Sequence, residues 1–347
     1  MKKVLVAMSG GVDSSVVALK LKQSGFLCCG ATAIMYNSGQ ETPIYLSRAQ
    51  KVCKQLGIEH VTLDYREEFK EKVIKPFIKT YEKGATPNPC ILCNIYFKFG
   101  KLFEYAKNNN FDYFATGHYA RVCYDSLKKR WLLKKSKNKD KDQTYFLYFL
   151  QQEQLEKILF LLEDLDKDVV KQIAKENGFE SYKIKESQDI CFVEGKKYSS
   201  FIREHTRKEW PQGNFVDVSG QVLGKHNGII NYTIGQRKGI GLSFKEPMFV
   251  QKIDFLRNEV VLSKEEELFT KIAFAKNLRF ICKENLKDEF RCSLKIRYRQ
   301  KEEEAIVFRV EKDLVKIVFE KKQRAVAKGQ AVVFYSGEDV LGGGELC

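Results

Sequence analysis

Apolar residues follow two alternating patterns in the first third of the chain. Short apolar runs, typical of buried strands, lie at Lys3–Ala7, Cys29–Met35, His60–Asp64 and Tyr113–Thr116. Between them, apolar residues recur about every three or four positions, which predicts helices at Ser14–Ser24, Leu46–Leu56, Arg66–Lys83 and Asn94–Asn108. This alternation predicts a Rossmann-like α/β domain with a doubly wound parallel sheet, whose ligands bind beyond the carboxyl ends of the strands. Pro76, inside the third helix, predicts a kink or break.

The pattern changes in the second half of the chain. Residues 143–178 are helical in pattern, 185–193 predict an exposed loop, and short alternating runs with many glycines fill 212–254. After Leu278 the pattern predicts strands only, at Phe290–Tyr298, Ala305–Val310, Leu314–Phe319 and Val332–Tyr335. Short strands at near-even spacing favour a small barrel. We therefore expect an α/β domain at 1–204, a small central β-rich domain at 205–272 and a C-terminal β-barrel at 273–347.

Composition limits the classes of protein that remain. A chain of 347 residues suits two or three domains of about 150 residues each. No apolar run approaches the roughly 18 residues of a membrane span, and the run after Met1 ends at Ser9, too early for a signal peptide. We therefore expect a cytoplasmic protein without a membrane partner. Most of its ten cysteines are then expected to be buried thiols, Cys282 among them, rather than a disulfide framework.

The formal net charge of +15 favours an acidic partner. Eight Lys and Arg residues and one Asp fall between Lys128 and Lys141, together with Trp131. Such a basic segment suits the phosphate backbone of a nucleic acid. The solvated tip of a hairpin is the alternative. A membrane surface is a less favoured partner, because no basic amphipathic helix stands out.

A glycine-rich loop, Ser9-Gly10-Gly11-Val12-Asp13-Ser14-Ser15, joins the first strand to the first helix. A loop in this place directs backbone N–H groups and a helix N-terminus at an anion. We expect Gly10 and Gly11 to adopt positive φ there. Val12-Asp13 stands where a Walker loop carries its lysine, which weakens a kinase or ATPase interpretation. The loop instead resembles the PP-loop of enzymes that split ATP into AMP and pyrophosphate; a plain Gly/Ser turn is the alternative.

Three cysteines stand outside the apolar pattern. Cys90 and Cys93 follow Thr86-Pro87-Asn88-Pro89, whose prolines predict a rigid approach to a helix that opens at Cys93. At a helix N-terminus the pKa of a thiol is lowered. A zinc half-site would need a second cysteine pair at ligand spacing, which the sequence lacks. A thioredoxin-like dithiol, or a nucleophile with Cys191 as its distant partner, remains, and buried structural thiols are the alternative.

With these motifs the chain resembles the tRNA-specific 2-thiouridylases nearly from end to end. The further blocks that carry the resemblance are Ala115-Thr116-Gly117-His118-Tyr119-Ala120-Arg121, Lys141-Asp142-Gln143-Thr144-Tyr145-Phe146-Leu147, Cys191-Phe192, Gly235-Gln236-Arg237-Lys238-Gly239 and Gly329-Gln330-Ala331-Val332-Val333. One block would be weak evidence, but their joint order is specific. The resemblance implies an adenine-nucleotide alpha-hydrolase (PP-loop) domain at the N-terminus and a C-terminal barrel that grips tRNA.

The resemblance also implies a reaction: ATP-dependent 2-thiolation of the wobble uridine of tRNAs for Lys, Glu and Gln. Uridine O2 would attack the α-phosphate, pyrophosphate would leave, and sulfur would then displace AMP from C2. Cys191 matches the persulfide carrier and Cys93 the nucleophile that releases the sulfur, with a Cys93–Cys191 disulfide as a possible product. Asp13 would help hold Mg²⁺ beside the pyrophosphate. The implied ATP contacts are Ala7, Met8, Ser9, Gly10, Gly11, Val12, Asp13, Ser14, Met35 and Gly117.

The partners implied by the resemblance are the anticodon arm of tRNA and a persulfide donor, either a sulfur-relay protein or a cysteine desulfurase. The implied tRNA contacts are Asn88, Pro89, Cys90, His118, Lys141, Asp142, Gln143, Arg297, Tyr298 and Gln330. From the residues alone, His118 would be a satisfied loop histidine. Arg297-Tyr298 suits phosphate positioning with base stacking. The target uridine must leave the anticodon stack to react.

Alternatives remain open at this stage. Some relatives carry Asp where this chain has Cys90, and a thiol does not simply replace a carboxylate. Cys90, Cys93 and Cys191 could together hold a 4Fe–4S cluster with one open iron. Two rival functions are a different PP-loop enzyme, such as an amide-forming synthetase that has no use for the thiols, and a non-catalytic RNA-binding module with a vestigial nucleotide site.

Overall fold

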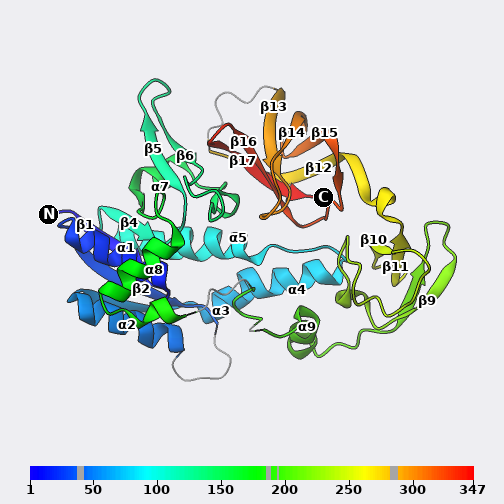
Figure 1. The fold of residues 1–347 in the computed structure, drawn as a ribbon, viewed down its shortest axis with the longest axis horizontal. Coiled ribbons are helices and arrows are strands. Elements are labelled where there is room, and N and C mark those ends of the chain that lie inside the picture. Colours follow the sequence, from blue (N-terminus) through cyan, green and yellow to red (C-terminus); the bar gives the residue numbers. More distant parts are fainter. Residues whose placement is uncertain (37–42, 185–188, 194, 282–287) are drawn as a thin grey trace.

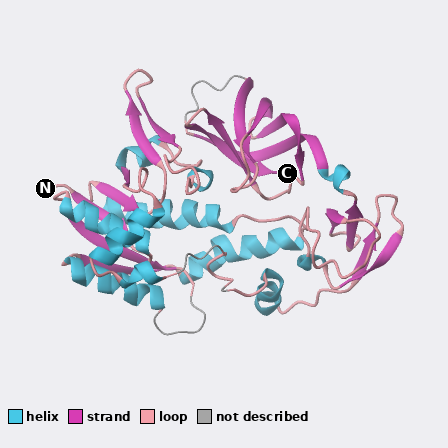
Figure 2. Cartoon of the chain, in the orientation of Figure 1, coloured by secondary structure: helices cyan, strands magenta, loops and turns pink. Residues whose placement is uncertain are grey.

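The computed structural model describes residues 1–36, 43–184, 189–193, 195–281 and 288–347. Within these ranges the chain forms three sheets: one in the N-terminal α/β part, one in the middle of the chain and one at the C-terminus (Figure 1, Figure 2). Cys282 and residues 185–188 of the expected loop lie outside the described residues. None of the described helices has the length and apolarity needed to cross a membrane.

The N-terminal sheet is parallel throughout its described strands, in the order β3-β2-β1-β4-β7. These strands are β1 (Lys3–Ala7), β2 (Leu27–Ile34), β3 (Glu59–Asp64), β4 (Tyr113–Thr116) and β7 (Ile158–Phe160). This confirms the predicted doubly wound α/β domain. Strand order reverses between β1 and β4, and the loops that leave these two strands therefore diverge and open a site for a ligand.

Alternate residues of β1 face two different cores. Val4 and Val6 pack with α1 (Val12–Gln23), α2 (Ile44–Leu56) and α8 (Lys167–Glu176) on one face of the sheet. Leu5 packs on the other face, with a long helix described below. All three side chains are fully buried. A strand buried on both faces must be apolar without interruption, which explains the pattern at the start of the sequence.

Two long helical segments run between the sheet and the rest of the molecule (Figure 1). They consist of α3 (Arg66–Phe69), η1 (Lys70–Ile74) and α4 (Lys75–Glu82), and of α5 (Pro89–Cys93), η2 (Asn94–Leu102) and α6 (Phe103–Asn108). The predicted break at Pro76 does not occur. The chain stays helical, and the turn before the proline is π-helical, a usual way to absorb a missing N–H.

The region 143–178 is less helical than its pattern predicts. Its elements are η3 (Thr144–Phe146), α7 (Gln152–Lys157), β7 and α8, followed by η4 (Glu180–Lys183). Strand β7 pairs with β4 and buries Ile158 and Phe160. The prediction of helix is wrong there because this pairing is long-range, and a short apolar run suits either structure.

The middle part of the chain is β-rich, as expected. It begins with α9 (Tyr198–Thr206) and forms an open sheet of order β10-β11-β8-β9. Its elements are β8 (Gly213–Val216), β9 (Val222–His226), η5 (Ile229–Asn231), β10 (Phe249–Asp254), β11 (Glu259–Ser263) and η6 (Glu265–Leu268). Phe215, Val250 and Leu262 form its own small core.

The C-terminal sheet closes into a barrel through the pairing of β12 with β17. Its strands are β12 (Phe269–Phe280), β13 (Glu289–Lys295), β14 (Glu303–Glu311), β15 (Leu314–Arg324), β16 (Ala331–Ser336) and β17 (Asp339–Leu346). A hairpin from the N-terminal part, β5 (Arg121–Asp125) and β6 (Arg130–Lys134), joins the edge of this sheet at β17 and projects beyond it (Figure 1).

The barrel packs directly on the α/β part. The Tyr145 hydroxyl donates to the carbonyl oxygen of Ala331 at 2.9 Å, and the Thr86 N–H donates to the carbonyl oxygen of Lys328 at 2.8 Å. The side-chain amide of Gln330 donates to the carbonyls of Thr86 and Pro87, at 3.0 Å each. The barrel therefore fixes the backbone that leads to the Cys90 and Cys93 thiols.

Candidate active site

The predicted phosphate loop leaves β1 at the reversal of strand order and enters α1. Gly10 has φ +70°, and a Cβ there would lie 2.3 Å from the carbonyl oxygen of Tyr45. Gly10 is therefore required both by backbone conformation and by close approach. The prediction is wrong for Gly11, which is extended at φ −91° and serves as the N-cap of α1. Its lack of a side chain leaves the first N–H groups of the helix directed at the site.

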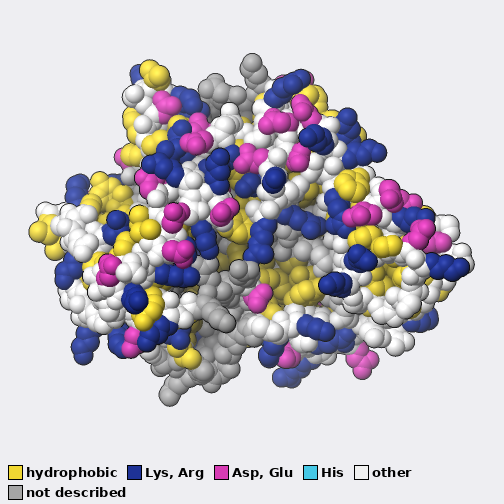
Figure 3. Space-filling model, in the orientation of Figure 1, with side chains coloured by type: hydrophobic (Ala, Val, Ile, Leu, Met, Phe, Trp, Pro, Cys, Tyr) yellow, Lys and Arg dark blue, Asp and Glu magenta, His cyan; other side chains and the backbone are white. Residues whose placement is uncertain are grey.

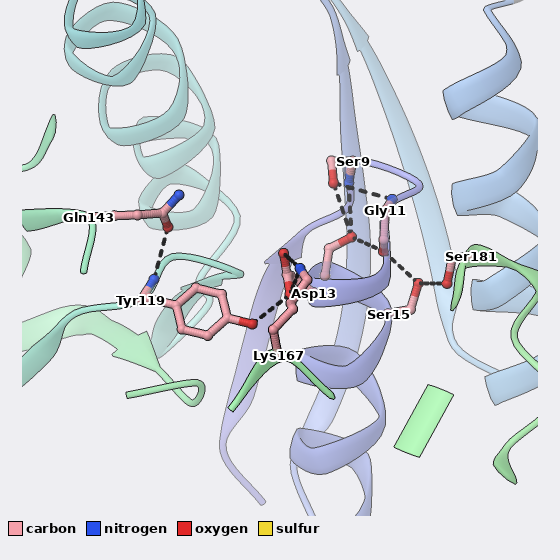
Figure 4. Close-up of polar contacts among 9 residues, drawn as sticks. Ser9, Gly11, Asp13, Ser15, Tyr119, Gln143, Lys167 and Ser181 are labelled. Atoms are coloured by element: carbon pink, nitrogen blue, oxygen red, sulfur yellow. Dashed lines mark hydrogen bonds and ion pairs between the residues drawn. The ribbon is translucent and has the colours of Figure 1, made fainter. Parts of the chain in front are cut away.

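Hydroxyl groups hold this loop against the first turn of α1 (Figure 4). Ser14 and Ser15 donate to the Gly11 carbonyl oxygen at 3.1 and 2.9 Å. The Gly11 N–H donates to Ser9 Oγ at 3.4 Å. Ser181, which precedes α9, donates to Ser15 Oγ at 3.4 Å. These contacts preorganise the loop for an anion, so that little ordering is left for the moment of binding.

The remaining predicted ATP contacts surround the loop. They are Ala7 at the end of β1, the buried Met8 and Val12, Met35 after β2, and Gly117 after β4. A Cβ on Gly117 would lie 2.9 Å from Cβ of Asp13 and 3.1 Å from the backbone nitrogen of Ser14. The structure thus brings the ends of three neighbouring strands around the N-terminus of α1, as the sequence predicts.

Asp13 is held by a network that includes two residues the sequence did not single out (Figure 4). Lys167 Nζ lies 2.7 Å from both carboxylate oxygens, and the Tyr119 hydroxyl donates to one of them at 2.9 Å. Gln143 accepts from the Tyr119 N–H at 2.9 Å and donates its own N–H to the Tyr119 carbonyl at 2.9 Å. Tyr119 lies in a block that carries the family resemblance, but nothing in the local sequence marks Lys167.

Cys93 lies at the end of α5, inside the helix and not at its first turn. The helix begins at Pro89, with Asn88 as N-cap, because a proline at the first helical position loses no hydrogen bond. Burial raises the pKa of the Cys93 thiol to about 12, although the charge of Lys98 acts in the opposite direction. The predicted lowering of this pKa is therefore wrong, since desolvation of the thiolate exceeds any helix-dipole effect.

The other two candidate thiols approach Cys93. Cys90 and Cys191 are exposed, whereas Cys93 is half-buried. Surrounding protein raises the pKa of Cys90 and of Cys191, and the negative charge on either raises that of Cys93. Lys98 lowers the pKa of all three. The three predicted sulfur residues therefore share one electrostatic environment with one lysine.

Buried neighbours fix the Cys191 segment and link the thiols to the nucleotide side. Phe192 is 2% exposed and packs into an aromatic cluster, with its ring 5.2 Å from that of Phe77. Met35 and Cys93 pack against the same cluster. The Cys93 thiol lies 3.5 Å from the sulfur of Met35. The residue expected beside the adenine thus touches the residue expected to handle sulfur.

The raised pKa of Cys93 predicts a distinctive pH dependence. Because the thiol form dominates below the pKa, alkylation of Cys93 in the folded protein should accelerate about tenfold per pH unit between about pH 7 and pH 10. In urea-unfolded protein the rate should level off above about pH 9, since an ordinary thiol has a pKa near 8.5. Mass spectrometry of the Cys93 peptide measures both rates. If the alkylation rate of Cys93 in the folded protein levelled off near pH 8, burial would not raise the pKa of this thiol.

Several residues predicted to contact tRNA have partners within the protein. His118 is buried and bonds Thr116 Oγ1 through Nδ1 at 2.8 Å. Burial holds the pKa of His118 well below its usual value, so the ring is neutral, as in a satisfied loop histidine. Asp142 accepts from the Ser136 N–H and the Thr144 hydroxyl, at 2.9 and 2.6 Å. Burial raises the pKa of Asp142.

The predicted tRNA contacts in the barrel lie where it meets the rest of the chain. Arg297 donates to the carbonyl of Ala325 at 2.8 Å, and burial lowers the pKa of Arg297. The Tyr298 ring lies 4.6 Å from that of Phe146. With Gln330 bonded to Thr86 and Pro87, these residues connect the barrel to the backbone before Cys90. Lys141, beside Asp142, is half-buried.

The basic segment 128–141 is partly neutralised by nearby carboxylates. Lys134 pairs with Asp339 at 2.7 Å, Lys135 with Glu302 at 2.6 Å and Lys137 with Asp164 at 2.8 Å. These lysines therefore offer less charge to a nucleic acid than the sequence suggests. Lys and Arg side chains are nevertheless spread over the face shown in Figure 3, including its centre, where the barrel meets the α/β part.

Comparison with known proteins places this site in a family. Three family models cover the chain: the tRNA methyl transferase HUP domain at residues 2–195, the tRNA methyl transferase PRC-barrel domain at 199–264 and the Aminomethyltransferase beta-barrel domain at 270–346. The tRNA-specific 2-thiouridylase MnmA of Clostridioides difficile is 46% identical over 351 residues, which span 99% of this chain and 97% of the relative. The protein of the same description from Acetivibrio thermocellus is 45% identical over 353 residues, 99% of this chain and 98% of the relative. The resemblance seen in the sequence is thus confirmed, and the chain belongs to the tRNA-specific 2-thiouridylases, a family of sulfurtransferases.

Proposed function

We propose that this protein uses ATP to activate O2 of the wobble uridine of tRNA and then replaces that oxygen with sulfur from a cysteine persulfide. The observation that carries the proposal is the 3.5 Å contact between the sulfurs of Cys93 and Met35. It brings the residue expected beside the adenine into contact with the residue expected to handle sulfur, which supports one shared site for activation and sulfur transfer. An amide-forming PP-loop enzyme would have no use for those thiols.

The first step is adenylation, which turns a poor leaving group into a good one. Uridine O2 attacks the α-phosphate, the bond from that phosphorus to the bridging oxygen breaks, and pyrophosphate leaves with the electron pair. The N3 proton of uridine passes to solvent. The N-terminus of α1 and the Ser9–Gly11 loop would bind the phosphates, while Met35 and Gly117 would lie near the adenine.

The second step moves sulfur to C2. The outer sulfur of a Cys191 persulfide attacks C2 and AMP leaves; a persulfide is a stronger nucleophile there than water. Cys93 then attacks the inner sulfur, which breaks the S–S bond, releases 2-thiouridine and forms a Cys93–Cys191 disulfide. A thiol reductant must supply two electrons to restart the cycle. The exposure of Cys191 suits reloading by a persulfide donor, a sulfur-relay protein or a cysteine desulfurase.

Among the described residues, no three His, Cys, Asp or Glu side chains are grouped to hold a metal ion. The residues as placed therefore do not fit an iron–sulfur cluster on Cys90, Cys93 and Cys191, and we route no step through one. Both oxygens of Asp13 accept from Lys167 in the described structure, and the assignment of Asp13 to Mg²⁺ stays a prediction. Any Mg²⁺ would enter with ATP as part of the substrate.

The substrate is proposed to be the anticodon arm of the tRNAs for Lys, Glu and Gln, in the cytoplasm. Asn88, Pro89 and Cys90 would meet the extruded base, since the backbone before them is fixed by Gln330 of the barrel. Arg297 and Tyr298, at the same junction, would position the RNA. His118, Lys141, Asp142 and Gln143 would shape this side of the site through the buried contacts described above.

The test is mass spectrometry of nucleosides from unmodified tRNA-Lys incubated with the full chain, Mg·ATP, a persulfide donor (a cysteine desulfurase with free cysteine) and a thiol reductant. We expect a 2-thiouridine peak that requires ATP and is lost in Cys93→Ser. AMP formed on adding tRNA without a peak would mean activation with a missing sulfur donor. Neither AMP nor 2-thiouridine would overturn the proposal and favour a non-catalytic RNA-binding role.

A further inference from the structure

A lysine from a distant helix lies at the phosphate loop. Lys167 is the first residue of α8, yet its ammonium contacts Asp13 in the first turn of α1, 154 positions earlier in the sequence. The residue is 9% exposed. Lysines are almost never buried to this degree without a partner and a reason, because the charge loses its hydration. Interactions with its neighbours must therefore offset the hydration that the buried ammonium loses.

Those neighbours hold the ammonium in place at the N-terminus of α1. Both Asp13 oxygens accept from Lys167 Nζ at 2.7 Å. The Tyr119 hydroxyl donates to the same carboxylate at 2.9 Å, and Nζ lies 5.8 Å from the centre of the Tyr119 ring. Gly117 approaches Asp13 from β4, close enough that a Cβ there would lie 2.9 Å from Cβ of Asp13. Figure 4 shows the Asp13, Lys167 and Tyr119 side chains converging beside the Ser9–Gly11 loop.

This placement answers a problem that the loop creates. A Walker loop carries a lysine that reaches the β- and γ-phosphates, whereas here Val12-Asp13 stands at that point. A bare carboxylate in the first turn of α1 would repel a triphosphate. Pairing with Lys167 removes that repulsion, because both carboxylate oxygens face its ammonium.

Resting on the adenylation proposed above, we propose that Lys167 is a further catalytic residue of this protein: its ammonium, mounted on Asp13, binds the β- and γ-phosphates of ATP and neutralises pyrophosphate as it leaves. The bond that breaks joins the α-phosphorus to the bridging oxygen, and the electron pair departs on pyrophosphate, where negative charge develops next to Nζ. Lys167 thus does from α8 what the Walker lysine does from within its loop.

The alternative is an ion pair that only ties α8 to α1, and ligand affinities separate the two. In Lys167→Met we expect the affinity for pyrophosphate to fall about tenfold to 100-fold, as for loss of a hydrogen bond to a charged group. AMP, which lacks the β- and γ-phosphates, should bind as it does to wild type. Isothermal titration with magnesium pyrophosphate and with AMP measures both. A purely structural role would weaken both ligands together or neither.

Turnover supplies a second readout. With tRNA present, AMP formation by Lys167→Met should fall in kcat about 100-fold or more, as for removal of a transition-state donor, and Lys167→Arg should recover part of it. Lys175→Ala, an exposed lysine on the same helix, is the matched control and should equal wild type. If wild type itself forms no AMP, the proposed function fails. If wild type is active and Lys167→Met keeps its pyrophosphate affinity, only the assignment of Lys167 fails.

Removing Lys167 alone leaves Asp13 unpaired, which can impair folding. The double variant Asp13→Asn/Lys167→Met removes both charges and keeps both shapes. It should fold. Its affinity for pyrophosphate should still be about tenfold or more below that of wild type, whereas its affinity for AMP should equal that of wild type. Wild-type affinity for pyrophosphate in the double variant would overturn the proposal.

Discussion

Cys191→Ser is expected to abolish 2-thiouridine formation while leaving ATP-dependent activation intact. A serine hydroxyl cannot carry a persulfide, so the outer sulfur that attacks C2 is missing. In the proposed mechanism adenylation takes place at the N-terminus of α1 and does not use Cys191. AMP and pyrophosphate should therefore still form when tRNA is added. We expect a loss of thiolation of at least about 1000-fold, as for removal of a nucleophile.

The measurement pairs two assays on one sample: 2-thiouridine by mass spectrometry and AMP by chromatography. Cys123→Ser is the matched control, because Cys123 is a half-buried free thiol in the β5–β6 hairpin, away from the proposed chemistry. Binding of tRNA should be unchanged in both variants. Thiolation by Cys191→Ser at the wild-type rate would show that Cys191 does not carry the persulfide. Loss of AMP as well would mean that this thiol is needed for activation.

Strands β1 and β4 of the α/β sheet are the elements that the sequence predicts best. The predicted bounds of β1 and β4 agree with the structure to the residue. Both are buried, apolar and short, and a local pattern is enough to define them. The same pattern placed the phosphate loop at the end of β1, which in a parallel sheet determines where the ligand binds.

Elements that depend on distant partners were not predictable in this way. Strand β17, which is not among the predicted strands, contains Gly342, Gly343 and Gly344, and glycine is more typical of turns than of strand interiors. In the barrel these glycines are needed because a Cβ at each would lie 2.3 to 2.7 Å from a carbonyl oxygen of a neighbouring strand. That crowding exists only once β12 and β16 are in place. Strand β7 has the same origin, since its only local signal is a short apolar run.

The candidate site shows the same division. Its residue types and order were visible in the sequence, but the electrostatic state of the residues was not. A thiol near prolines and a helix start predicts a lowered pKa, whereas the packing of Phe97 and Phe192 around the Cys93 region desolvates the thiolate and raises it. No local pattern in the sequence marks Lys167, because the role proposed for it depends on a contact with Asp13 across 154 positions.

Gly10→Ala is expected to disable the nucleotide site. The new Cβ would lie 2.3 Å from the carbonyl oxygen of Tyr45, and φ is +70°. The backbone must therefore shift, and the loop must leave the shape that directs N–H groups at the phosphates. We expect the free energy of unfolding to fall by about 2 kcal/mol or more, and ATP affinity to fall more than about tenfold, as for loss of charge-assisted hydrogen bonds.

Gly25→Ala separates the two causes. Gly25 has a similar φ of +82°, but a Cβ there would meet nothing within 4 Å. Its free energy of unfolding should fall only by the strain of a Cβ at positive φ, about 1 kcal/mol, and it should bind ATP normally. Thermal unfolding with and without Mg·ATP measures both quantities, because a ligand that binds the folded state raises the unfolding temperature. If Gly10→Ala behaves like Gly25→Ala in both, the contact with Tyr45 does not shape the loop. If Gly10→Ala alone loses the ATP-dependent shift, the close packing of α2 against the loop sets the nucleotide site.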